Sequence, residues 1–214
     1  MGTSAKGSRA VHSQEDADSV VADALAAEDR LQRALKAGGL LVLTVEPRQA
    51  RRAEAELLRR FGQDSGSNPA LQRMSFDALL LKALRAEATA ARVDWNMVLR
   101  ADAAEPGSRD WANLQRLVQR TLNKIKPELL TSSAPLLLTN VGLWVRYHLM
   151  ALLTEIETSA GRLGHTPSLW LLLPSHKQGL PMIDGVPVPL VNSTQAFALP
   201  QAWTENQHRA AAPA

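Results

Sequence analysis

Polar side chains stand at the ends of three apolar runs, and they are the residues of this sequence best placed to do chemistry. The runs span residues 40–45, 136–140 and 167–174 and have the length and apolar character of strands buried in a parallel sheet. Ligands of such sheets bind beyond the carboxyl ends of the strands. The candidate ligand-binding residues at that edge are Glu46, Arg48, Thr139, Asn140, Ser175 and His176. The favoured alternative is that they are ordinary turn and capping residues, because Asn and Ser are common at such positions.

The motifs of the common enzyme classes are absent from the sequence. A phosphate-binding loop needs Gly-x4-Gly-Lys-Ser/Thr, but the run 40–45 leads directly into Glu46-Pro-Arg-Gln-Ala. The run 136–140 ends in Thr-Asn, where a nucleotide-hydrolysing sheet would carry a Mg²⁺-binding acid. No nucleophile elbow or kinase loop motif occurs, the five histidines lack metal-ligand spacing, and there is no cysteine. We therefore expect no catalytic residue, no metal and no cofactor, and the missing motifs argue against ATP hydrolysis by this chain alone.

A stripe of basic residues offers a different chemistry. Its members are spaced by seven, four and four positions, which places them on one face of a helix. These candidate nucleic-acid-binding residues are Arg109, Arg116, Arg120 and Lys124. A linear cationic face can track the phosphates of DNA. The favoured alternative is a solvated outer face opposite the apolar stripe of the same helix.

Amphipathic segments between the apolar runs predict the helices that position these residues. The predicted helices span residues 13–37, 47–61, 75–84, 94–99, 108–126 and 141–160. Pro127 is expected to end or kink the fifth of these helices, and a Gly-rich break at 161–164 ends the sixth. Asp184-Gly185 between apolar flanks predicts a β-hairpin. A short strand near 70–74 and a last helix from Pro200 complete the prediction, whose fold class is α/β with a parallel sheet.

Length and composition set the number of domains and the compartment. The 214 residues, 45% of them apolar, suit one domain, which we place at residues 18–206 between a disordered tail, 1–17, and a frayed tail, 207–214. The net charge is only +3, so charge alone does not indicate a polyanion partner. No apolar run approaches the ~18–20 residues of a membrane span. The lack of cysteine is natural in a reducing cytoplasm, where we expect this protein.

Several strings carry a family resemblance over about four-fifths of the chain. They are residues 41–48, 94–104, 107–114, 135–140, 169–175 and 183–189, followed by Trp203 and residues 206–209. On these strings the chain resembles the C-terminal region of the large Ser/Thr-kinase component of the bacterial Pgl (phage growth limitation, BREX type 2) defence systems. The ATPase component of the same systems is the second family considered.

The resemblance implies a fold, a role and partners, although the chain is too short for a kinase domain. It implies a three-layer, P-loop-like (RecA/Rossmann-type) fold with a degenerate nucleotide site and a C-terminal β-hairpin. The implied role is a non-catalytic interaction or regulatory module that binds other protein components of a defence complex. Two alternatives stay open: a DNA-binding accessory module that uses the basic helix faces, and an enzyme or nucleotide-binding protein with an unrecognised site at the strand ends.

Overall fold

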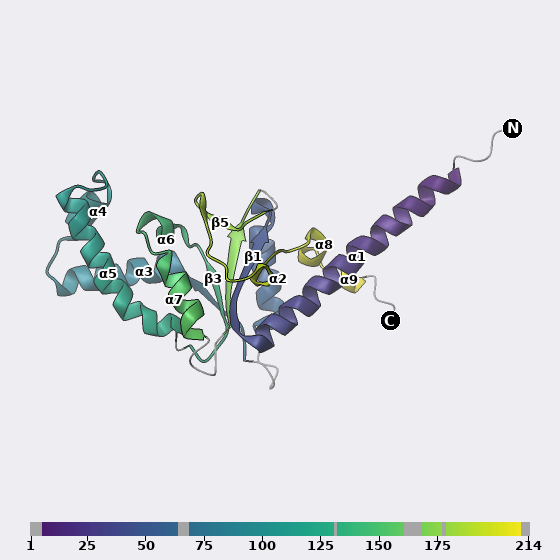
Figure 1. Cartoon of the computed structure of the whole chain (residues 1–214), viewed down its shortest axis with the longest axis horizontal. Coiled ribbons are helices and arrows are strands. Elements are labelled where there is room, and N and C mark those ends of the chain that lie inside the picture. The colour runs from purple at the N-terminus through teal and green to yellow at the C-terminus, as the bar shows by residue number, and fades with distance from the viewer. Residues whose placement is uncertain (1–5, 64–68, 131, 161–167, 177–178, 211–214) are drawn as a thin grey trace.

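A five-stranded, fully parallel sheet forms the centre of the fold (Figure 1). The computed structural model describes residues 6–63, 69–130, 132–160, 168–176 and 179–210. The strands, in spatial order, are β2 (Gln72–Ser75), β3 (Leu136–Thr139), β4 (Ser168–Pro174), β1 (Gly39–Val45) and β7 (Ala196–Ala198). The predicted parallel α/β sheet is confirmed. The sequence did not predict β7, the short strand at the edge next to β1.

Helices cover both faces of the sheet, which is why the interior strands are apolar throughout. On one face lie α3 (Phe76–Ala90), α5 (Arg109–Leu130), α6 (Gly142–Arg146) and α7 (Ala151–Ala160). On the other face lie α1 (Lys6–Ala37), α2 (Ala50–Phe61), α8 (Gln201–Thr204) and α9 (Gln207–Ala210), with the short 3-10 helix η1 (Pro47–Gln49) before α2. Successive residues of β1 alternate between the two cores, with Val42 in the first and Leu43 in the second.

The helix α4 (Trp95–Asp102) packs on α5 at the end of the molecule opposite the projecting part of α1 (Figure 1). Side-chain caps fix the starts of the helices around it, as the sequence predicts. Ser75 accepts a hydrogen bond from the third residue of α3, Asp94 from the second residue of α4, and Ser108 from Trp111 of α5.

The first helix is longer than predicted. α1 begins at Lys6 rather than at Ser13 and projects beyond the sheet (Figure 1). Extending an existing helix costs little compared with nucleating one, so the polar composition of this region does not stop it. The helix ends where Gly38 adopts a positive φ of 71°. Residues 1–5 and 211–214 lie outside the described residues, and the division into one domain with two tails stays a prediction.

The prediction of one continuous helix between β3 and β4 is wrong. α6 ends at Arg146 and α7 begins at Ala151, because His148 takes the left-handed conformation with φ of 57°. The amide of Leu149 then donates to the carbonyl of Trp144 at 2.7 Å, and the amide of His148 donates to Val145 at 3.1 Å, which together form a Schellman cap. Residues 161–164, where a Gly-rich break is expected, lie outside the described residues.

The prediction that the helix ends at Pro127 is also wrong. α5 continues through Pro127 to Leu130. Proline removes a backbone hydrogen bond inside a helix, but Leu129 beyond it is buried in the core, and this packing outweighs the local cost. The helix therefore ends where its buried stripe ends.

The predicted hairpin is confirmed as a separate two-stranded sheet. It consists of β5 (Met182–Ile183) and β6 (Val186–Pro187). Asp184 and Gly185 both have positive φ, 46° and 82°, as a type I′ turn requires. A second 3-10 helix, η2 (Ser193–Gln195), leads from the hairpin into β7. Among the described helices, none is both long and apolar enough to cross a membrane.

Candidate functional site

The carboxyl edge of the sheet divides into two parts, so the predicted ligand-binding residues do not form one group. β1 and β4 end together, since Val45 pairs with Pro174 and the amide of Ser175 donates to the carbonyl of Val45 at 2.8 Å. The pairing of β3 with β4 stops at Leu138 and Leu171, three residues short of that end. At ~3.3 Å per residue, Thr139 lies about 7 Å back from the edge that β1 and β4 form.

Glu46 and His176 lie near each other at the outer part of this edge. Glu46 is exposed, and its Oε1 accepts a hydrogen bond from Nε of Arg48 at 2.6 Å. That hydrogen bond lowers the pKa of Glu46, and the nearby charge of His176 lowers it further. The structure therefore brings together Glu46, Arg48, Ser175 and His176, four of the six predicted residues. All of the carboxylate's strong contacts are to exposed side chains, so the group is open to solvent.

Thr139 and Asn140 belong to the inner part, beside β2. Asn140 has a positive φ of 50°, and its Nδ2 donates to Oγ of Ser75 at 3.3 Å. Its carbonyl accepts from the amide of Asp77 at 2.9 Å. Thr139 is 5% exposed, and its Oγ1 has no hydrogen-bond partner among the described residues. Strand alternation points Thr139 the same way as Leu137, into the layer of α1 and α2. These two residues are separated from Glu46 and do not share its surroundings.

A carboxylate, Glu205, lies beside the start of α2. Gln49 immediately precedes the helix, and its side-chain oxygen accepts a hydrogen bond from Oγ1 of Thr204 at 2.5 Å. Nε2 of Gln49 contacts Oε1 of Glu205 at 3.5 Å, and Arg52 lies 3.9 Å from the same oxygen. The hydrogen bond from Gln201 lowers the pKa of Glu205, and the contacts with Gln49 and Arg52 add to this effect. The carboxylate of Glu205 therefore lies beside two side chains at the start of α2.

Sequence reasoning missed a pair of carboxylates next to Asn140. Oδ1 of Asp77 accepts from the amide of Leu143 at 3.1 Å, and desolvation by burial raises the pKa of Asp77. A β-carbon placed on Gly142 would lie 3.7 Å from Asp77 and 3.4 Å from Asp184 of the hairpin turn. The pair links the hairpin to the first turn of α6. No group of three or more histidine or acidic residues within the described residues is placed to hold a metal ion.

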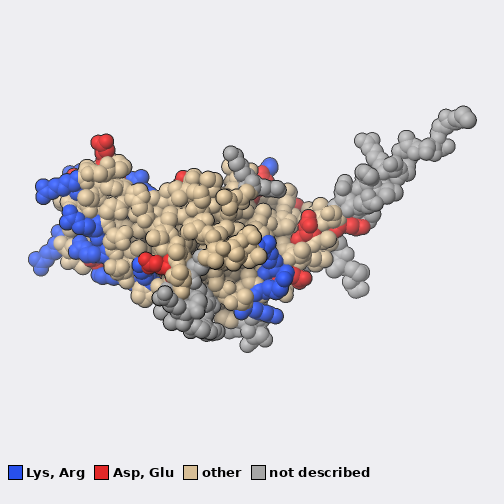
Figure 2. Space-filling view, viewed as in Figure 1, with Lys and Arg blue, Asp and Glu red and all other residues tan. Residues whose placement is uncertain are grey.

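The four basic residues of the stripe share the outward face of α5, as their spacing predicts, but two of them contact the same acid. Lys124 hydrogen-bonds Glu87 of α3, and Arg120 lies 3.9 Å from that carboxylate. Arg116 donates to Asn113 at 3.0 Å, and Arg109 is exposed. The Lys124 hydrogen bond lowers the pKa of Glu87. Figure 2 shows other basic side chains at the same end of the molecule. The role of the stripe in binding nucleic acid stays a prediction.

A buried ionic cluster, which was not predicted from the sequence, connects the two ends of the described chain. The side chain of Arg60 on α2 is only 1% exposed. Its guanidinium pairs with the carboxylates of Glu28 and Glu56, at 2.7 Å from Glu56. It also contacts Oδ1 of Asn206 at 2.9 Å and Nε2 of His208 at 3.0 Å. The ring of Trp203 lies 4.3 Å from the guanidinium carbon. The indole N–H of Trp203 also donates to Glu28 at 2.7 Å. The cluster thus joins α1, α2, α8 and α9, and it gives residues 203–209 a structural role.

Comparisons with known proteins identify one relative. The chain is 33% identical over 203 residues to a Streptomyces coelicolor protein described as "Probable kinase PglW". The match covers 90% of this chain but only 12% of that protein. No protein-family model matches the chain, and no solved structure matches it. The resemblance to a segment of the Pgl kinase component, expected from the sequence, is confirmed.

Proposed function

We propose that this chain, a relative of one segment of PglW, is a non-catalytic interaction or regulatory module of a Pgl-type phage-defence system. The observation that carries the proposal is the 33% identity over 90% of the chain. The chain contains no His-Arg-Asp or Asp-Phe-Gly kinase loop, so the part it shares with the relative is outside the phosphoryl-transfer machinery. Such a module would contribute to an assembly by binding other proteins through its surface.

The geometry of the sheet edge supports a P-loop-like architecture that has lost its nucleotide site. An interior strand, β1, leads into a helix, as in nucleotide-binding sheets, but Pro47 and Gln49 form a 3-10 turn in place of a glycine-rich loop. The carboxylate of Glu205 contacts the side chains of Gln49 and Arg52 beside the start of that helix, and its negative charge disfavours a phosphate there. β3 ends in Thr139 and Asn140 rather than in a carboxylate. These features disfavour both the nucleotide and its metal.

The proposed partners are other protein components of a Pgl-type complex in the cytoplasm. The test is affinity capture of the tagged chain co-expressed with each Pgl component of its host. Capture of one component in a fixed ratio supports the proposal, and failure to capture any of them overturns it.

A second candidate, DNA binding, is favoured by the position of Arg109 and Arg116 on the outer face of α5. Electrophoretic mobility shift of a short duplex at low and moderate salt tests this candidate, because phosphate contacts weaken steeply as salt rises. A third candidate, an unrecognised nucleotide or enzyme site, is favoured by the closeness of Glu46 and His176. A thermal shift with ATP or ADP that Glu46→Gln removes would establish it.

A further inference from the structure

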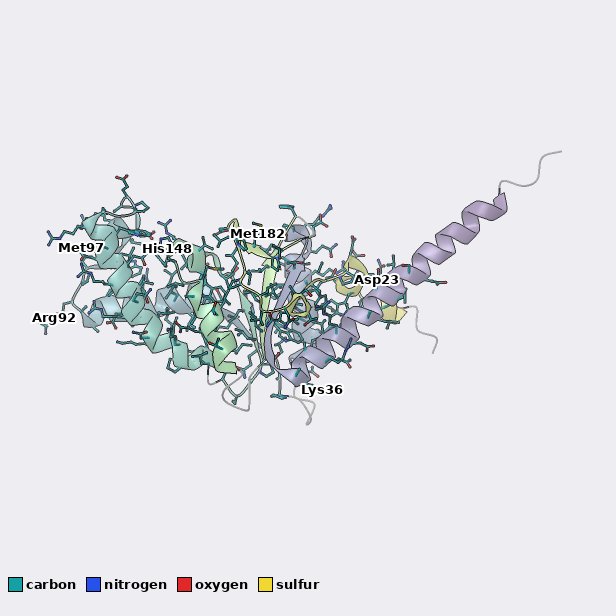
Figure 3. The ribbon with its side chains drawn as sticks, viewed as in Figure 1. Asp23, Lys36, Arg92, Met97, His148 and Met182 are labelled. Atoms are coloured by element: carbon teal, nitrogen blue, oxygen red, sulfur yellow. The ribbon has the colours of Figure 1, made fainter. Side chains whose placement is uncertain are left out.

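An open groove of about 1060 Å³ runs between α4 and α5, at the end of the molecule away from α1. Its floor is apolar and is formed by Val93, Met97, Val98, Ala101, Leu114 and Leu117. Met97 is 55% exposed, and Figure 3 shows it at this end, far from Asp23 and Lys36 of α1. This volume is at the upper limit of the ~300–1,000 Å³ of small-molecule pockets.

The rim of the groove is cationic. Arg100 of α4 and Arg116 and Arg120 of α5 line it, against the single carboxylate of Asp110. These four groups sum to a formal charge of +2, three positive and one negative. Arg120 is also near Glu87, so Arg100 and Arg116 carry most of the rim's available charge. An occupant with carboxylates along its edges is therefore complementary to this rim.

Hydrogen bonds at the ends of α4 fix the position of this helix, which forms one wall of the groove. Oδ1 of Asp102 accepts from Nε of Arg146 at 2.9 Å and from the hydroxyl of Tyr147 at 2.9 Å. At the other end, the amide of Val93 donates to the carbonyl of Ala88 of α3 at 2.8 Å, just before Asp94 caps the helix. With both ends fixed, α4 does not need to reorganise when a partner binds, which lowers the cost of association.

We propose that the groove between α4 and α5 binds an acidic amphipathic helix of a partner protein. This inference rests on the proposed function and gives the interaction module its surface. Apolar side chains at i, i+3, i+4 and i+7 of the partner would cover Met97 and the half-buried Val93, and its flanking carboxylates would pair with Arg100 and Arg116. Nucleic acid is disfavoured as the occupant, because its phosphates cannot cover an apolar floor, and Lys124 and Arg120 already contact Glu87.

The test is fluorescence anisotropy with a labelled synthetic helix of about five turns. Its sequence carries Leu at i, i+3, i+4 and i+7 and Glu at the flanking positions, and a second peptide has Lys in place of every Glu. We expect the full chain to bind the Glu peptide roughly tenfold or more tightly than the Lys peptide. The double variant R100E/R116E should lose this binding, and Met97→Glu should weaken it about tenfold.

Arg51→Glu is the matched control, since Arg51 is exposed on α2, away from the groove. It makes the same charge change as each single substitution, R100E or R116E, and should leave binding unaltered, with circular dichroism confirming that every variant is folded. No binding of the Glu peptide at roughly 100 µM, or equal binding by R100E/R116E, overturns the proposal. Competition by a short DNA duplex with the same loss in R100E/R116E would assign the surface to nucleic acid instead.

The same variants separate this inference from the proposed function. If a Pgl component is captured by the tagged chain and R100E/R116E captures it equally well, the interaction module stands and the groove is the wrong surface. If the unmodified chain captures no component, the proposed function itself fails. Loss of capture in R100E/R116E, with capture retained in Arg51→Glu, supports both.

Discussion

Arg60→Met tests the claim that one buried guanidinium holds the two ends of the chain on the sheet. The substitution keeps much of the side-chain volume but removes the guanidinium that pairs with Glu28 on α1 and with Glu56 on α2. Breaking a buried ion pair by removing one member typically costs about 3–5 kcal/mol, because the remaining charge is left uncompensated. The cation–π contact with Trp203 is lost as well. We therefore expect a fall of this size in the free energy of unfolding.

Arg59→Met provides a matched control on the same helix. Arg59 also pairs with Glu56, at 2.6 Å, but its side chain is 51% exposed, so its loss should cost less than about 1 kcal/mol. Urea unfolding followed by circular dichroism measures both variants. At ~2–4 °C per kcal/mol, Arg60→Met should lower the midpoint of thermal unfolding by roughly 6–20 °C. If the two variants lost equal stability, the reasoning about the buried cluster would be refuted.

Three further substitutions test separate parts of the account. Glu56→Gln removes a carboxyl whose pKa is lowered to about 2, chiefly by its hydrogen bond with Arg59, so urea unfolding should show the stability gap from the parent closing as pH falls from 4.5 to 2. Tyr147→Phe removes the hydrogen bond to Asp102, which should lower the free energy of unfolding by about 1 kcal/mol in the same assay. Burial raises the pKa of Tyr147 to about 12, so the parent should lose additional stability between pH 10 and 12 and the variant should not. Pro127→Ala restores a helix hydrogen bond inside α5 and should raise the midpoint of thermal unfolding, with a gain of up to about 3 kcal/mol.

Each of these three has a contrary result. A pH-independent gap for Glu56→Gln would mean that its carboxylate is no better stabilised in the folded chain than in the unfolded one. If the parent and Tyr147→Phe lost the same stability between pH 10 and 12, the hydroxyl of Tyr147 would have to lie in solvent. Destabilisation by Pro127→Ala would show that α5 needs the ring itself at this position.

The interior strands were predictable because their apolar runs are buried on both faces. β1, β3 and β4 each present a pattern that solvent-exposed segments do not have. β7 escaped prediction because it is three residues long, pairs with β1 alone and has no buried residue. The turn at His148 also has no local signal, since neither glycine nor proline marks it; it coincides with the contact between Tyr147 and Asp102, which are 45 residues apart.

In the candidate site, too, the features set by strand pairing could be predicted, whereas those set by residues distant in the sequence could not. The adjacency of Glu46 and Ser175 follows from parallel pairing, so strand positions were enough to predict it. The separation of Asn140 depends on its positive φ and on the shorter register of β3, which sequence does not reveal. Glu87 reaches Lys124 across two helices, and Glu205 reaches Gln49 across the domain, so neither neutralising contact could be read from spacing.

The central claim is that the chain acts by binding a partner protein. Light scattering after size-exclusion chromatography tests it most directly, with the purified chain mixed with purified Pgl components one at a time. The account predicts that one component elutes together with the chain at the molar mass of a fixed-ratio complex, with or without ATP. Elution of the chain alone beside every component, at concentrations of roughly 10 µM, would contradict it.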